Sequence, residues 1–160
     1  MKKNNSIILF STSLIFILSV IAGKLIMSGI TKYRETHFSC DANVVVLNKN
    51  NKLTMITTYF FEGDHGFVII KGNLNHDDKT YNVSRKALFS IEKLQTVLSL
   101  NSTHVDISPG DNAPSELIEQ ILPSFFYKTN KTFEYSIYPR GWDGLVFSTG
   151  YIPLFYCHRF

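Results

Sequence analysis

The sequence predicts a mainly β fold of the α+β class, with an N-terminal transmembrane helix followed by a curled antiparallel sheet or small barrel. Two patterns predict this: an uncharged apolar run near the N-terminus, and short β-branched stretches separated by turn residues. We expect seven to eight strands and one short helix. The length of 160 residues allows one domain with an appendage and excludes a two-domain enzyme.

The apolar run predicts a membrane anchor. Residues 6–23 carry no formal charge, and after Lys24, whose amine can reach the interface, the sequence stays apolar through Ile30. A helix needs roughly 20 apolar residues to cross a bilayer core of about 30 Å. We therefore expect a cytoplasmic tail over 1–5, a transmembrane anchor over 6–30 and a periplasmic β-rich domain over 31–160.

The alternative for the N-terminus is a cleaved signal peptide. Lys2 and Lys3 would form its positive region, and residues 20–22 (Val-Ile-Ala) would form the cleavage site. The apolar run is longer than the usual apolar region of a signal peptide, which has about 7–15 residues. This length favours an anchor that is retained.

Two cysteines, Cys40 and Cys157, bracket almost the whole region beyond the apolar run. A disulfide between them would close a loop worth roughly 4–5 kcal/mol in the chain-entropy model. Such a bond forms in an oxidising compartment such as the bacterial periplasm. We expect the disulfide, and with it a domain on the periplasmic side of the inner membrane; the alternative is two reduced, buried thiols in the cytosol. Basic residues flank both ends of the run, so charge does not decide the orientation.

Strands are expected wherever apolar and β-branched stretches end in turn residues. The third strand is expected to continue through residues 71–74 past a glycine bulge at Gly72. Residues 90–100 suit either a helix or a strand, and the surrounding hairpins favour a strand. The predicted strands are 43–47, 53–61, 67–70, 80–89, 132–138, 145–148 and 151–156.

One segment has the signals of a helix. Pro114 or Ser115 begins it, acidic residues occupy its first turns, and Pro123 ends it. Its apolar residues follow helical spacing. We expect this helix to pack at the mouth or side of the sheet or barrel.

The overall charge of +3 belongs to the membrane flanks. Residues 1–36 hold five Lys or Arg against one Glu, while residues 37–160 hold eleven against twelve acidic residues. The outer domain is therefore nearly neutral and has no basic stripe for nucleic acid. We expect no direct contact with DNA or RNA.

The sequence contains no motif of an enzyme or a metal site. A P-loop, a dinucleotide fingerprint, H-E-x-x-H and G-x-S-x-G are all missing, and the cysteines and histidines lack ligand spacing. We expect no catalytic residue, no cofactor and no metal. His65, His76 and His104 are candidates for pH sensing, because histidine titrates in the range that a periplasm experiences; simple solvation is the alternative.

Aromatic residues make up 14% of the chain, which is high for a small domain. Most are expected in the core, and the excess could line a ligand cavity or a partner interface. The candidates for such a partner or ligand surface are Trp142, Tyr59, Phe61 and Phe126. For Trp142, a ring folded back on the core is the alternative.

The chain resembles the FidL-like family of small enterobacterial inner-membrane proteins, and within it the fimbrial regulators PsaF and MyfF. The segments that carry the resemblance are Cys40 after the anchor, 66–72, 83–85, 122–126, 132–137, 144–147 and 152–159. The resemblance implies a ToxS-like companion of a ToxR-like, membrane-bound transcription regulator. Such a companion binds and stabilises the regulator's periplasmic domain and so permits fimbrial or virulence gene activation.

The resemblance further implies a barrel completed by the partner, and a small hydrophobic ligand of the bile type within it. An open sheet edge fits this expectation, because an edge is a template for an added strand. Two alternatives remain: a stand-alone, lipocalin-like periplasmic module that binds a ligand, and a secreted fimbria-associated protein.

Overall fold

The computed structural model describes the backbone of residues 2–160 and the side chains of residues 16–160. It divides the chain into two compact units, residues 1–36 and residues 37–160. The first holds one helix, α1 (Lys2–Thr36). Within it, Phe16–Thr36 is long and apolar enough to cross a membrane. The expected tail falls partly on Met1, which lies outside the described residues, while Lys2–Asn5 belong to α1.

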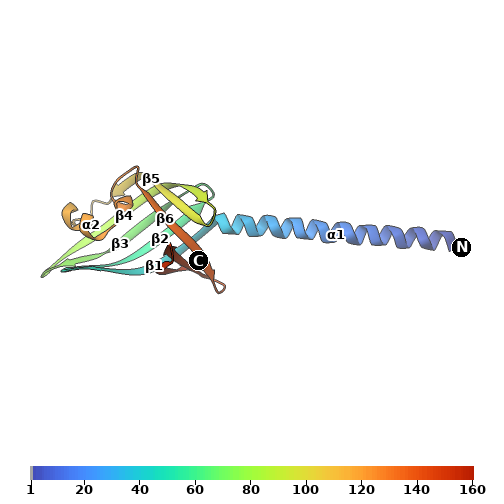
Figure 1. The fold of residues 1–160 in the computed structure, drawn as a ribbon, viewed down its shortest axis with the longest axis horizontal. Helices are drawn as coiled ribbons and strands as arrows, with labels where there is room; N and C mark the ends of the chain where they lie inside the picture. Colours follow the sequence, from blue (N-terminus) through green and yellow to red (C-terminus); the bar gives the residue numbers. More distant parts are fainter. Residues whose placement is uncertain (1) are drawn as a thin grey trace. The chain divides into compact units, whose positions relative to one another are not determined.

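The second unit is a closed barrel of eight antiparallel strands, each paired with the next in the sequence (Figure 1). This confirms the expected mainly β fold and its strand number. The strands are β1 (His37–Asn48), β2 (Asn51–Glu62), β3 (His65–His76), β4 (Lys79–Leu94), β5 (Val97–Ile107), β6 (Thr132–Arg140), β7 (Gly144–Thr149) and β8 (Ile152–Arg159).

Alternation along the strands places the core inside the barrel. In β2, Leu53, Met55, Thr57, Tyr59 and Phe61 are buried, while the residues that alternate with them face outward. A strand with this period of two presents one apolar face, and the barrel closes that face upon itself. The other buried apolar residues come from every strand, from α2 and from the segment after it.

Gly72 does not form the expected bulge. The pairing of β3 with β2 and β4 runs through this residue without a break in register. A Cβ at Gly72 would collide with the carbonyl oxygen of Thr54 and with Met55. The glycine is therefore required by the close approach of a neighbouring strand and not by a bulge.

The ambiguous segment 90–100 contains a turn between two strands. β4 continues to Leu94, Gln95 adopts a positive φ of 58°, and β5 begins at Val97. The preference for strand was therefore right for most of these residues. The strand continues to Ile107, which the polar residues after Leu100 did not indicate.

The two short helices follow β5. α2 (Ser115–Ile121) lies between the expected boundary prolines Pro114 and Pro123, and the 3₁₀ helix η1 (Ser124–Phe126) begins directly after Pro123. The Asn48 side-chain amide donates to the Gln120 carbonyl oxygen at 2.6 Å. This contact holds α2 at the end of the barrel where β1 turns into β2, and so at its mouth.

Candidate functional site

The barrel closes at a short seam between β1 and β8. The ladder between these strands contains only two pairs, Cys40 with Arg159 and Asp41 with His158. By contrast, β1 and β2 pair along their whole length. The seam is thus the weakest junction of the sheet in terms of backbone pairing.

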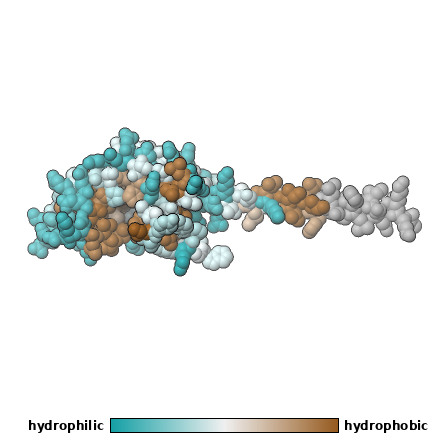
Figure 2. Space-filling view, viewed as in Figure 1, coloured by the Kyte–Doolittle hydropathy of each residue, from teal (hydrophilic) through white to brown (hydrophobic). Residues whose placement is uncertain are grey.

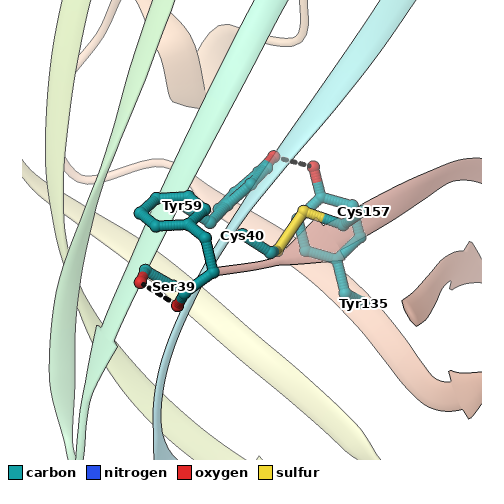
Figure 3. The surroundings of a disulfide bond; sticks show 6 residues. Ser39, Cys40, Tyr59, Tyr135 and Cys157 are labelled. Carbon is teal, nitrogen blue, oxygen red and sulfur yellow. Dashed lines mark hydrogen bonds between the residues drawn. A yellow bond between two sulfur atoms is a disulfide. The ribbon is translucent and has the colours of Figure 1, made fainter. Parts of the chain in front are cut away.

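A disulfide fastens this seam. Cys40 and Cys157 are fully buried, with 5.5 Å between their Cα atoms, and they join the first strand to the last (Figure 3). The Phe160 amide also donates to the Ser39 carbonyl oxygen at 3.4 Å. The expected pairing of the two cysteines is confirmed, and its place explains its use: it crosses the junction that has the fewest backbone hydrogen bonds.

Beyond the two pairs, β1 and β8 separate, so the rest of the seam is open. Among the described residues, β1 from Ala42 to Asn48 pairs only with β2, and β8 from Ile152 to Tyr156 pairs only with β7. A cleft of about 370 Å³ opens between them. It is lined by Asp41, Asn43, Val44, Val45, Leu154, Phe155, Tyr156 and His158.

The backbone of β1 faces this cleft at every second residue. Because the Ser39 carbonyl oxygen points toward β8, the regular alternation of an antiparallel strand directs the backbone groups of Asn43, Val45 and Leu47 the same way. No strand of the barrel pairs with them on that side among the described residues. They form a row of donors and acceptors suited to another extended chain.

Apolar side chains flank the cleft on the outside of the barrel. Val45 and Leu47 on β1, and Leu154 and Tyr156 on β8, are all exposed. The space-filling view shows apolar side chains gathered on the face of the barrel over β1 and its neighbours (Figure 2). Exposed apolar residues beside unpaired strand edges are typical of a protein-binding surface.

The interior of the barrel is filled by aromatic rings. Tyr59 stacks on Phe147 with centroids 5.1 Å apart, and it meets Tyr135 edge to face at 6.0 Å. The two tyrosine hydroxyls share a hydrogen bond of 2.8 Å beside the disulfide (Figure 3). Burial raises the pKa of both phenols, so both stay neutral. The pair satisfies two polar groups that would otherwise be costly in an apolar core.

A buried ion pair ties the loop before α2 to the barrel. Arg85 on β4 and Asp111 have side chains that are 5% and 2% exposed, and Arg85 Nε donates to Asp111 Oδ2 at 2.9 Å. The carboxylate also accepts the Ser84 and Ala113 amides. These bonds satisfy the buried charges and fix the loop that leads to α2. The sequence alone did not indicate this pair, because Arg85 and Asp111 belong to different elements.

Family comparison covers the barrel from its first strand to its second cysteine. The sequence model of the YqeJ C-terminal domain family matches residues 37–157. The chain belongs to the YqeJ C-terminal domain family. No curated protein and no solved structure matches it. The YqeJ C-terminal domain thus begins where β1 begins and includes both cysteines, the seam and the aromatic interior.

The structure separates the residues that sequence reasoning grouped as a partner or ligand surface. Trp142 is fully exposed in the turn between β6 and β7. Tyr59, Phe61 and Phe126 are core residues of the YqeJ C-terminal domain and form no surface. Tyr59 and Phe61 share the inward side of β2 with Leu53, and this alternation is the signal that could have placed them correctly.

The three candidate histidines lie on separate elements. His65 is at the start of β3, where its Nδ1 lies 2.8 Å from an Asp64 carboxylate oxygen, and this hydrogen bond raises the pKa of the imidazole. His76 ends β3 and lies 2.6 Å from the Asn51 side-chain oxygen. His104 lies on β5. The structure brings none of the three together, so each would act alone.

No metal-binding cluster of three or more His, Cys, Asp or Glu residues occurs among the described residues. The features that stand out in this YqeJ C-terminal domain are instead the open seam and the filled interior. The first offers backbone edges and apolar side chains to a partner. The second leaves the barrel interior occupied by the protein's own rings.

Proposed function

We propose that this protein is the membrane-anchored periplasmic companion of a ToxR-like transmembrane transcription regulator. In this role it binds the regulator's periplasmic domain, stabilises it and permits activation of fimbrial or virulence genes. The anchor is α1, retained in the inner membrane, and the barrel faces the periplasm. An apolar helix and a disulfide-bonded domain support this arrangement.

The observation that carries the proposal is the open seam between β1 and β8. Two strand edges face each other across a cleft, with unpaired backbone groups at Asn43, Val45 and Leu47. An extended segment of the regulator would add to β1, and its outward side chains would cover the exposed apolar residues. Such pairing supplies affinity through the backbone, while the flanking side chains select the partner.

The filled interior bears on the lipocalin-like alternative. A module of that type holds its ligand inside the barrel, whereas here Tyr59, Tyr135 and Phe147 pack together in the middle. A small hydrophobic ligand would therefore bind in the cleft beside the partner strand. The proposed companion role needs no ligand to operate.

The physical effect of the companion is linkage. A protein that binds only the folded regulator stabilises that fold by mass action, in proportion to the logarithm of its concentration relative to Kd. Acid or temperature would act by changing the stability of the complex. The regulator's lifetime is therefore the quantity that should depend on this protein.

The test is co-purification of the full-length protein with a co-expressed ToxR-like regulator from solubilised membranes. Val45→Pro removes an amide donor that faces the cleft, and Val45→Lys places a charge on the edge; both should weaken binding and shorten the regulator's lifetime. Thr54→Lys is the matched control. Thr54 is exposed beside Val45 in the same row, but β2 is paired on both sides.

Binding that survives both Val45 variants would refute the seam as the binding site. Failure of the wild-type proteins to associate, or a regulator lifetime that is independent of this protein, would refute the companion role itself. A Thr54→Lys variant that also fails to bind would point to a general disturbance of the outer face and would count against the seam.

A further inference from the structure

One end of the barrel collects several separate segments. In a barrel whose strands run alternately up and down, the turns β2–β3, β4–β5 and β6–β7 lie at the end where β1 begins and β8 finishes. Figure 1 shows the β4–β5 turn in yellow-green and the β6–β7 turn in orange-red at that end. We name this the entry end, since the chain enters the barrel there at His37.

The entry end exposes large apolar side chains from three different segments. Trp142 in the β6–β7 turn is fully exposed, Leu94 at the β4–β5 turn is 58% exposed, and the C-terminal Phe160 is 68% exposed. Single exposed apolar residues are ordinary. Three such residues on separate segments at one end of a small barrel form a discontinuous surface, which we call the apolar rim (Trp142, Leu94 and Phe160).

The covalent chain identifies what this rim meets. Thr36 is the last residue of α1 and His37 is the first residue of β1, so their Cα atoms are about 3.8 Å apart and no linker separates the units. If α1 crosses a bilayer, the barrel is attached to the membrane through its entry end and not through the opposite end. Exposed apolar residues also occur at the opposite end, but only the entry end is joined to the anchor.

Tryptophan suits this position, because it is enriched where a protein meets the headgroup layer of a bilayer. Charged residues at the entry end are of both signs, with Lys93 and Arg140 on one side of the balance and Glu62 and Asp64 on the other. The contact with lipid is therefore based on burial of the apolar rim in the interfacial layer and not on a net attraction to anionic lipid.

We propose that the entry end docks on the lipid surface, with Trp142, Leu94 and Phe160 inserted at the level of the headgroups. This inference rests on the anchoring by α1 that forms part of the proposed function. Docking would hold the barrel upright on the membrane, which fixes the height and direction of the seam relative to a partner that is anchored in the same bilayer.

Trp142 is the chain's only tryptophan, so its fluorescence reports on this site alone. The experiment places the full-length protein in nanodiscs of zwitterionic phosphatidylcholine, with and without bromine atoms high on the acyl chains. Docking predicts that brominated lipid removes most of the emission and that acrylamide in the buffer quenches little. Because the contact is apolar, raised salt should leave both results unchanged.

A matched variant moves the reporter to the other end. Trp142→Phe combined with Tyr151→Trp places the only tryptophan in the β7–β8 turn, where Tyr151 is fully exposed. This tryptophan should respond to acrylamide and not to brominated lipid. Far-UV circular dichroism of the variant verifies the fold, and the wild-type measurement stands without it.

The outcomes distinguish failure of the docking inference from failure of the anchoring by α1. A protein that fails to co-fractionate with nanodiscs, or that alkaline carbonate extracts from membranes, refutes the anchor. A protein that inserts but whose Trp142 ignores brominated lipid refutes docking of the rim. Equal quenching of the two tryptophan positions also refutes it, because the barrel would then have no preferred end at the membrane.

Discussion

Removal of the disulfide should destabilise the barrel more than any single core substitution. The double variant Cys40→Ala/Cys157→Ala removes a cross-link between two residues that are 117 positions apart in the sequence. In the chain-entropy model, a loop of that length is worth about 5 kcal/mol at 25 °C. Small domains have a total free energy of unfolding of about 5–15 kcal/mol, so the loss is a large fraction of it.

A local effect accompanies the loss of global stability. Only two residue pairs join β1 to β8, so without the disulfide the seam has little to hold it together. The strands β2 and β3, by contrast, are paired on both sides along their whole length. We therefore expect hydrogen exchange at Asp41 and Phe160, whose amides face across the seam, to accelerate first, before exchange in β2 and β3.

The assay is urea unfolding of the full-length protein in nanodiscs, followed by circular dichroism. The double variant should unfold at a much lower urea concentration, and dithiothreitol should shift the wild type toward it. Dithiothreitol should leave the double variant unchanged, which controls for side effects of the reductant. A loss below about 1 kcal/mol would refute the reasoning, since it would mean that the unfolded chain gains almost no freedom.

Three further outcomes follow from the interior and the turns. Tyr59→Phe should lower the free energy of unfolding by about 1–3 kcal/mol, because the Tyr135 hydroxyl loses its partner. The variant with both tyrosines changed to Phe should be closer to the wild type in stability. A double variant less stable than Tyr59→Phe would contradict this. Arg85→Met should cost about 3 kcal/mol or more by leaving the Asp111 carboxylate buried without its cation, and a neutral result in the same urea assay would contradict it. The hydrogen bond to Asp64 raises the pKa of His65 above its ordinary 6.5, so the pair stabilises the fold below that pH, and this stabilisation is lost as the pH rises through the raised pKa. His65→Gln should therefore lower the urea midpoint in mild acid and not in alkali. A difference in urea midpoint that does not depend on pH would contradict this.

Local patterns were enough to predict most of the barrel. The hairpins were identified because turn residues at 48–51 and 62–66 interrupt apolar and β-branched stretches. The helix over Ser115–Ile121 was identified because prolines mark both of its ends. The disulfide was predicted because an apolar run upstream and two widely spaced cysteines imply the same compartment.

Features that depend on register between distant segments were not predictable from one sequence. Nothing in the residues around Cys40 or Cys157 reveals that β1 and β8 pair at only two positions. The contact between Arg85 and Asp111 was not predictable for the same reason, since it joins a strand to a distant loop. Tyr59 and Phe61 are a different case: their inward parity was visible, and aromatic abundance outweighed it in the choice of surface candidates.

Hydrogen exchange of the β1 amides in the complex with the regulator tests the central claim most directly. Asn43, Val45 and Leu47 direct their backbone toward the cleft, so their amides should exchange rapidly in the free protein. If a strand of the regulator adds to this edge, these three amides become strongly protected while those of Val44 and Val46 change little. A stable complex in which Asn43, Val45 and Leu47 still exchange rapidly would contradict the claim that the seam is the partner-binding site.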